Sequence, residues 1–228
     1  MKLYFLLEDQ KSFMKVLPSW LEKCLPGYKR VYSAEALYDG SYIIESGYGY
    51  PNIKNVLIDK LIMFSKGKIQ PDCIVVFYDV DDWTENKISG IRSMFDNIFI
   101  SSGLDIDYQL LPIRRCFETW LLGNRDVFPK IADEQFRKYA EFYDVCQNDP
   151  EMMMCPAEYE DKVAMYHYSY PQCMLKLSTG RKYTKGHPGI AADISYLDSL
   201  LQRMKDTNDM DSFRRFIVFL QGTSSTNR

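Results

Sequence analysis

The distribution of apolar and polar residues predicts alternating strands and helices over the first half of the chain. Short continuous apolar runs bounded by polar residues are typical of strands buried on both faces. Such runs cover residues 2–7 and 74–78, and residues 41–46 and 107–112 are also expected to form strands. Apolar residues spaced by three and four predict helices over residues 11–25, 52–64, 84–95 and 114–122. This order indicates an α/β fold with a mostly parallel central sheet flanked by helices on both faces.

Beyond residue 125 the pattern changes. Helical spacing covers residues 126–143, 190–204 and 211–220, whereas residues 147–160 are expected to form an irregular connection. Residues 178–189 form a glycine-rich, basic segment that is typical of a loop. We therefore expect an α/β core over residues 1–125 and a mainly helical C-terminal extension over residues 126–228, packed together as a single compact unit.

Composition narrows the class of protein. A hydrophobic fraction of 46% and an aromatic fraction of 14% favour a globular fold over disorder. The net charge of −3 excludes a global basic field, although a local basic groove is compatible with it. No apolar run approaches the roughly 20 residues that span a bilayer. The six cysteines show no CxxC spacing, which favours reduced thiols in a cytoplasmic protein that has no membrane contact.

Acidic residues follow two of the expected strands. Glu8 ends the first, and Asp79, Asp81 and Asp82 end the strand that begins at residue 74. In open α/β sheets, ligands bind outside the carboxyl ends of the strands, and alternation along a strand would point Asp79 and Asp81 the same way. Adjacent carboxylates repel each other unless a cation lies between them, and Mg²⁺ or Mn²⁺ suits such oxygen ligands. The alternative interpretation is a buried strand followed by a solvated acidic turn.

A strand ending in Glu8 and a second strand ending in Asp79-x-Asp81 resemble the TOPRIM domain, which topoisomerases, primases and OLD-type nucleases share. The segment 111–122, with Glu118-Thr119-Trp120-Leu121-Leu122, resembles the E-x-W-L-L element of the RloB-like TOPRIM proteins, a group often associated with defence genes. Three further segments resemble the C-terminal part of that group, namely Tyr183-Thr184-Lys185, Gly189-Ile190-Ala191 and Phe213-Arg214-Arg215-Phe216. The resemblance thus spans most of the chain.

The resemblance implies a TOPRIM-like Rossmannoid fold and metal-dependent nuclease-type hydrolysis of DNA or RNA, in defence against phages and mobile elements or in competition between them. The implied catalytic residues are Glu8, Glu118 and Lys185. The implied ligands of Mg²⁺ or Mn²⁺ are Asp79, Asp81 and Asp82. Glu8 would be the general acid or base at the scissile phosphodiester, whereas Glu118 would complete the acidic pocket.

Basic residues are the candidates for nucleic-acid binding. Arg181 and Lys182 belong to the densest basic cluster of the chain, and Tyr183 between them and Lys185 could stack on a base. Arg114 and Arg115 could contact phosphate. The alternative interpretation is a solvated loop, with Arg114 or Arg115 balancing the charge of Glu118.

The chain departs from the TOPRIM pattern directly after Glu8. The family usually has glycine there, whereas this chain has Asp9, which adds negative charge where a glycine would let the backbone approach phosphate. This departure favours an alternative function, a catalytically inactive TOPRIM-like binding or regulatory module that acts through a partner protein. The partner could be an ATPase, because the chain has no Walker A motif of its own, or a second copy in a homodimer.

A third alternative is a phosphatase-like hydrolase with Asp79 as nucleophile. That scheme also needs a Lys and a Thr or Ser on later strands, and the sequence does not place them. Whether the chain is an enzyme therefore stays open at the level of sequence.

Overall fold

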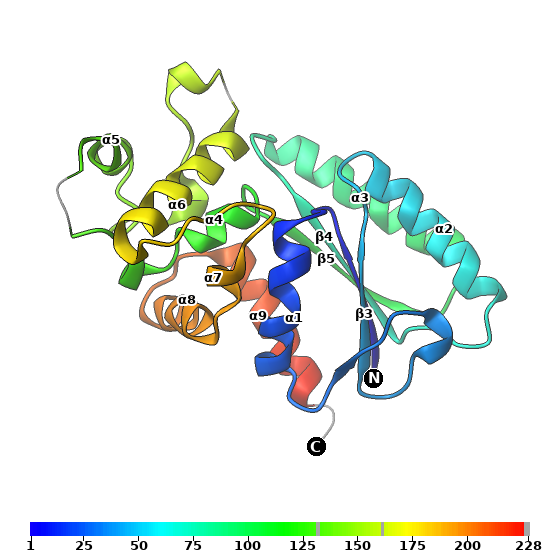
Figure 1. Ribbon diagram of the computed structural model, residues 1–228. Coiled ribbons are helices and arrows are strands. Elements are labelled where there is room, and N and C mark those ends of the chain that lie inside the picture. Colours follow the sequence, from blue (N-terminus) through cyan, green and yellow to red (C-terminus); the bar gives the residue numbers. More distant parts are fainter. Residues whose placement is uncertain (131–132, 161, 226–228) are drawn as a thin grey trace. The chain divides into compact units, whose positions relative to one another are not determined.

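The computed structural model describes residues 1–130, 133–160 and 162–225, and within them five strands form one all-parallel sheet (Figure 1). The strand order is β2-β3-β1-β4-β5. The strands are β1 (Lys2–Leu7), β2 (Lys29–Arg30), β3 (Ser41–Ser46), β4 (Cys73–Asp79) and β5 (Asp107–Ile113). Central β1 pairs with both β3 and β4, so that Leu7 lies opposite Ser46 on one side and Phe77 on the other. The expected α/β class with a parallel sheet is confirmed.

Helices cover both faces of the sheet (Figure 1). Aromatic ring pairs join these helices to the strands. The helices that follow the first strands are α1 (Ser12–Cys24), α2 (Asn52–Lys66) and α3 (Glu85–Ser102). On one face the ring pairs are Tyr4 with Phe64 of α2 and Tyr78 with Phe95 of α3, and on the other they are Phe77 with Phe13 of α1 and with Phe216 of α9 (Asp211–Ser225). Because successive residues of a strand point to opposite faces, Phe77 and Tyr78 reach different layers.

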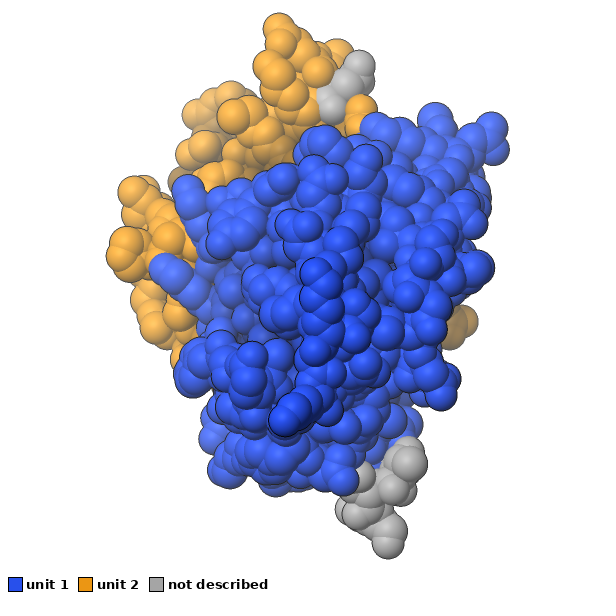
Figure 2. Space-filling model, turned by 90° about the vertical axis from the view of Figure 1, so that its right-hand side faces the viewer, with its two compact units in different colours: residues 1–78, 83–112, 216–228 blue, residues 79–82, 113–215 orange. Residues whose placement is uncertain are grey.

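The chain divides into two compact units, which Figure 2 shows in two colours. The first contains residues 1–78 and 83–112 and the chain from Phe216 on, and the second contains residues 79–82 and 113–215. The division expected at residue 125 places residues 113–125 in the core, whereas the structure groups them with the second unit. The reason is side-chain packing and bonding to residues far along the chain, such as the hydrogen bond between Thr119 and His167.

The second unit is built from helices and 3-10 turns. Its elements are α4 (Phe117–Leu121), η2 (Arg125–Val127), α5 (Glu134–Phe142), η3 (Pro150–Met152), η4 (Ala157–Tyr159), α6 (Val163–Thr179), α7 (Gly189–Ala192), α8 (Ile194–Asp206) and the start of α9. The helix expected over residues 126–143 is a 3-10 turn and the shorter α5, and residues 131–132 of that range lie outside the described residues. Helix α6 was not expected from the sequence, although its tyrosines Tyr166 and Tyr170 form much of the local core with Tyr139.

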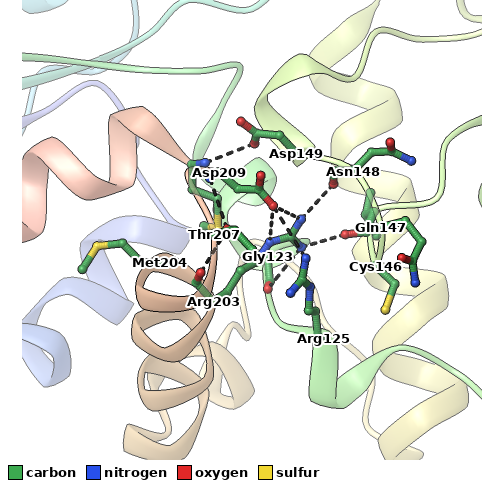
Figure 3. Close-up of polar contacts among 12 residues, drawn as sticks. Gly123, Arg125, Cys146, Gln147, Asn148, Asp149, Arg203, Met204, Thr207 and Asp209 are labelled. Carbon is green, nitrogen blue, oxygen red and sulfur yellow. Dashed lines mark hydrogen bonds and ion pairs between the residues drawn. The ribbon is translucent and has the colours of Figure 1, made fainter.

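A buried arginine organises one end of the second unit (Figure 3). The guanidinium of Arg203 on α8 is about 1% exposed and donates to Asp209 from Nε and Nη2, at 3.0 and 2.7 Å. It also donates to the carbonyl oxygens of Val145 and Asn148, at 2.7 and 2.8 Å. These bonds tie α8 to the turn after α5 and to the segment before α9. A buried charge is tolerated only with such partners, so this arginine fixes the paths of three segments.

We expect Arg203→Met to lower the free energy of unfolding by about 3 kcal/mol, because it leaves the carbonyl groups of Val145 and Asn148 without their donor and the Asp209 carboxylate with the more distant Arg125 at 3.8 Å. Urea denaturation followed by far-UV circular dichroism measures this change. The matched control is Lys205→Met, on an exposed position of the same helix, which should change the free energy by less than about 0.5 kcal/mol. A loss for Arg203→Met no larger than that of the control would contradict the assignment.

Candidate active site in the second unit

The acidic turn that follows β4 is bound to the segment between β5 and α4. Strand β4 ends at Asp79, and the backbone amides of Val80 and Asp81 both donate to the carbonyl oxygen of Arg115, at 3.1 and 2.8 Å. In return, Nη1 of Arg115 donates to the carbonyl oxygen of Asp81 at 3.1 Å. Arg115 therefore holds the turn through its backbone and its side chain.

Asp81 lies outside β4 and has a φ of 41°, in the left-handed region. Aspartate is one of the few residues other than glycine that adopt this region with some frequency. The expectation that Asp79 and Asp81 point the same way assumed an extended backbone through both residues, and the structure shows that this assumption is wrong. The turn, rather than strand alternation, sets the direction of Asp81.

Glu118 is a buried carboxylate on α4, with a side chain that is 1% exposed. Its Oε1 accepts a hydrogen bond of 2.9 Å from the hydroxyl of Tyr183, and its Oε2 lies 3.6 Å from Nζ of Lys185. Lys185 itself is 42% exposed, and its Nζ also lies 5.6 Å from the centroid of the Tyr168 ring. A buried carboxylate needs compensation of this kind. Glu118 thus holds a lysine that remains accessible to an anion.

The charged groups of the candidate site affect the pKa of the buried Cys116 thiol. Burial raises the pKa of the Cys116 thiol well above its ordinary value, and the negative charges of Glu118, Asp79 and Asp81 raise it further. The positive charge of Lys185 acts in the opposite direction and lowers this pKa. Three of the carboxylates expected from the sequence and the expected lysine therefore all act on the charge of this one buried thiol.

Two residues that the sequence did not single out support the start of α4. Oγ1 of Thr119 accepts hydrogen bonds from the backbone amides of Arg115 and Cys116, at 3.1 and 3.2 Å, and lies 2.8 Å from Nδ1 of His167. Nε2 of His167 lies 3.1 Å from the carbonyl oxygen of Met153. Donation from Nε2 to this carbonyl leaves Nδ1 as the acceptor for the threonine hydroxyl. Burial lowers the pKa of His167 to about 3, so the ring is neutral.

A second buried acid is linked to α4 through Ser212. Glu151, which is 2% exposed, accepts from the backbone amide and the hydroxyl of Ser212 at the start of α9. The same hydroxyl oxygen accepts from Nε1 of Trp120 at 2.8 Å and from the amide of Arg114 at 3.3 Å. Burial raises the pKa of Glu151 to about 7. Trp120 itself is fully buried.

Glu8 belongs to the first unit. Its backbone amide donates to the carbonyl oxygen of Phe77 at 2.9 Å, and its carboxylate accepts from the amide of Tyr50 at 3.1 Å. The next residue, Asp9, closes the start of α1, because its carboxylate accepts from the amides of Lys11 and Phe13, at 2.8 and 2.9 Å. Amides at a helix start are the groups that bind phosphate when a glycine turn exposes them. Here the chain's own carboxylate occupies them.

The residues expected to bind nucleic acid differ in accessibility. Lys182 is exposed, and Arg181 is exposed but pairs with Asp193 at 3.0 Å. Arg114 and Arg115 are half-buried. Tyr183 is fully buried, so its ring is not available to stack on a base. We correct its expected role to that of a hydrogen-bond donor to Glu118.

The side chains at the acidic turn offer few ligands for a divalent metal ion. Within residues 1–130, 133–160 and 162–225, no three or more His, Cys, Asp and Glu side chains are grouped to hold a metal ion. Mg²⁺ at phosphate sites is commonly held by one or two carboxylates together with phosphate oxygens. Half-buried Asp79 and Asp81 and exposed Asp82 are of this donor type, whereas Glu118 is engaged by Tyr183 and Lys185. Metal binding by the three aspartates stays a prediction.

Comparison with known proteins adds no family or activity: no family model, curated protein or solved structure matches this chain. In the part of the chain that the structure describes, no helix is long and apolar enough to cross a membrane.

The two buried groups predict opposite pH dependences. The pKa of His167 is lowered from 6.5 to about 3, so the folded state binds fewer protons and loses stability as the pH falls below 6.5. The pKa of Glu151 is raised from 4.5 to about 7, so the folded state binds more protons and loses stability as the pH rises through 7. Between pH 7.5 and pH 5, each of these two pKa shifts changes the free energy of unfolding by about 2 kcal/mol. The two changes have opposite signs, so they largely cancel in the wild type.

We therefore expect the free energy of unfolding of His167→Gln to rise by about 2 kcal/mol relative to that of the wild type when the pH is lowered from 7.5 to 5. For Glu151→Gln we expect this free energy to fall by about as much relative to the wild type. Urea denaturation at the two pH values measures both. The exposed His187→Gln serves as the control and should follow the wild type. Parallel pH profiles for all four proteins would show that neither buried group has the assigned shift.

Proposed function

We propose that this chain is a TOPRIM-like, Mg²⁺-dependent hydrolase of phosphodiester bonds in DNA or RNA. The observation that carries the proposal is the buried Glu118, which holds a partly exposed lysine and lies three residues after Arg115, the residue that binds the acidic turn at Asp81. Burying a carboxylate and pairing it with one lysine contributes little to stability on balance. The Lys185 ammonium group and the carboxylates of Asp79 and Asp81 together are suited to a site that binds phosphate, because the lysine attracts the phosphate and the carboxylates are hard oxygen ligands for a metal ion.

Each group has a role in this proposal. Asp79 and Asp81, with Asp82 beside them, would hold Mg²⁺ or Mn²⁺, which when bound polarises a phosphoryl oxygen. Lys185 would contact a non-bridging phosphoryl oxygen and stabilise the negative charge that develops on it. Arg115 positions Asp81 through the hydrogen bonds to the acidic turn. The exposed Lys182 would contact backbone phosphates away from the cleaved bond.

Two parts of the proposal rest on the sequence resemblance alone. Glu8 as the proton carrier stays a prediction, because the structure describes it within the first unit only. Action in phage or mobile-element defence, or in competition between such elements, also follows from the resemblance to RloB-like proteins.

Incubation of the purified chain with Mg²⁺ or Mn²⁺ and labelled single- and double-stranded DNA and RNA tests the activity. We expect cleavage by the wild type, and a loss of about 100-fold or more in Asp79→Asn and in Lys185→Met, because each removes one source of charge stabilisation. The matched control, Asp59→Asn, changes an exposed aspartate of α2 and should cleave like the wild type. The absence of wild-type cleavage with either metal, or equal cleavage by Asp79→Asn, would overturn the enzyme assignment.

One observation favours a second function, a catalytically inactive module that acts through a partner protein such as an ATPase. Asp9 fills the start of α1 with its own carboxylate, so the position after Glu8 does not offer free amides to a phosphate. Such a module would keep the fold and a binding surface but would have lost the anion site beside Glu8.

Thermal unfolding with and without Mg²⁺ distinguishes the two functions. The hydrolase should be stabilised by millimolar Mg²⁺, and Asp79→Asn combined with Asp81→Asn should abolish the shift, because a ligand that binds only the folded state raises its stability. The inactive module should show no metal-dependent shift and should be recovered in a stable complex with its partner protein. A metal-dependent shift in the wild type that the double variant retains would contradict binding at the acidic turn.

A further inference from the structure

The loop after β3, which is hydrogen-bonded to Glu8, carries two exposed tyrosines of the first unit. Tyr48 and Tyr50 lie in the loop after β3, and their side chains are 59% and 38% exposed. Trp83, two residues before α3, contacts Tyr50 edge to face, with the ring centroids 5.2 Å apart. Nζ of Lys87 lies 4.3 Å from the centroid of the Trp83 ring. Tyr48, Tyr50, Trp83 and Lys87 are called the aromatic platform below.

The loop that carries the platform is fixed by hydrogen bonds to the acidic strand end. The amide of Gly49 donates to the carbonyl oxygen of Glu8 at 3.0 Å, and the amide of Tyr50 donates to the Glu8 carboxylate at 3.1 Å. Before them, Gly47 has no room for a Cβ atom, which would lie 2.4 Å from a side-chain carbon of Ile53. The platform is therefore attached to the residue that the TOPRIM resemblance places at the scissile bond.

Tyr48 occupies an unfavourable backbone conformation. Its φ is 59°, in the left-handed region that bulky side chains rarely adopt. The neighbouring Gly49 has a φ of 84° and accommodates the same turn without strain. Strained residues of this kind cluster at ligand-binding sites, where the exposed side chain has a use that offsets the strain. Tyr48 in this conformation is exposed to solvent.

We propose that the aromatic platform binds single-stranded nucleic acid by stacking on its bases. Exposed aromatic rings with a nearby cation are what single-strand binding requires, because each ring accepts any base and the cation meets the backbone phosphate. A duplex hides the faces of its bases within its own stack, so it offers nothing for these rings to stack on. This inference rests on the proposed nucleic-acid function and specifies its substrate class.

The chain carries its own reporter for this binding. Of its three tryptophans, Trp20 and Trp120 are fully buried, whereas Trp83 is half-buried within the platform. We expect a single-stranded oligothymidylate of about 15 nucleotides to quench the Trp83 fluorescence of the full chain, and a duplex of the same length to bind at least about tenfold more weakly. The titrations are made in EDTA, so that binding is measured without hydrolysis.

Variants test each ring. Tyr48→Ala and Tyr50→Ala should each weaken single-strand binding between about 5-fold and 150-fold. Tyr48→Phe and Tyr50→Phe should bind like the wild type, because stacking needs the ring and not the hydroxyl. Trp83→Phe should remove the fluorescence change but keep binding, as measured by anisotropy of a labelled strand. The control is Tyr38→Ala, which changes an exposed tyrosine that precedes β3.

Equal affinity for duplex and single strand, no binding in EDTA, or unchanged affinity in Tyr48→Ala and Tyr50→Ala would overturn the inference. Addition of Mg²⁺ to the same samples separates it from the proposed hydrolysis. If only the hydrolysis is wrong, the single-strand preference and the tyrosine effects persist without cleavage. If only the inference is wrong, cleavage depends on Asp79 but not on the platform tyrosines.

Discussion

Buried charge in the second unit is the constraint on which the rest of this structure depends. Arg203 is almost fully buried and reaches Asp209 and the carbonyl groups of Val145 and Asn148, so segments that are far apart in the sequence must converge on one guanidinium. An unpaired buried charge would cost several kcal/mol, a large share of the stability of a typical domain. The chain paths around Arg203 therefore have little freedom.

The same constraint shapes the candidate site. Glu118 is as buried as Arg203, and its partners Tyr183 and Lys185 come from a segment 65 residues later in the chain. Arg115 in turn holds the acidic turn at Asp81. The groups proposed to act on phosphate are thus positioned by interactions that the fold must satisfy in any case. A site built in this way is preorganised, which is the property that electrostatic catalysis needs.

The local pattern of apolar residues was sufficient to predict the strands that are buried on both faces. The expected strands at residues 2–7 and 74–78 agree closely with β1 and β4, because a strand buried on both faces is apolar almost throughout. The strands expected at residues 41–46 and 107–112 also match the bounds of β3 and β5 closely, although β5 is partly exposed. Helix α6 was missed, since its tyrosines, Pro171 and two-sided packing obscure the helical period. The two-residue β2 was also missed, because its hydrogen bonds to β3 rather than any apolar run define it.

The sequence by itself determined the α/β class, the parallel sheet and the position of the acids at strand ends. These features follow from the alternation and spacing of side chains within short segments. Only the tertiary structure decided that Glu118 pairs with Lys185, that Tyr183 is buried, and that Thr119 and His167 support the start of α4. The physical reason is that a buried polar group takes whichever partner the fold brings within hydrogen-bonding distance, and no local periodicity records that partner.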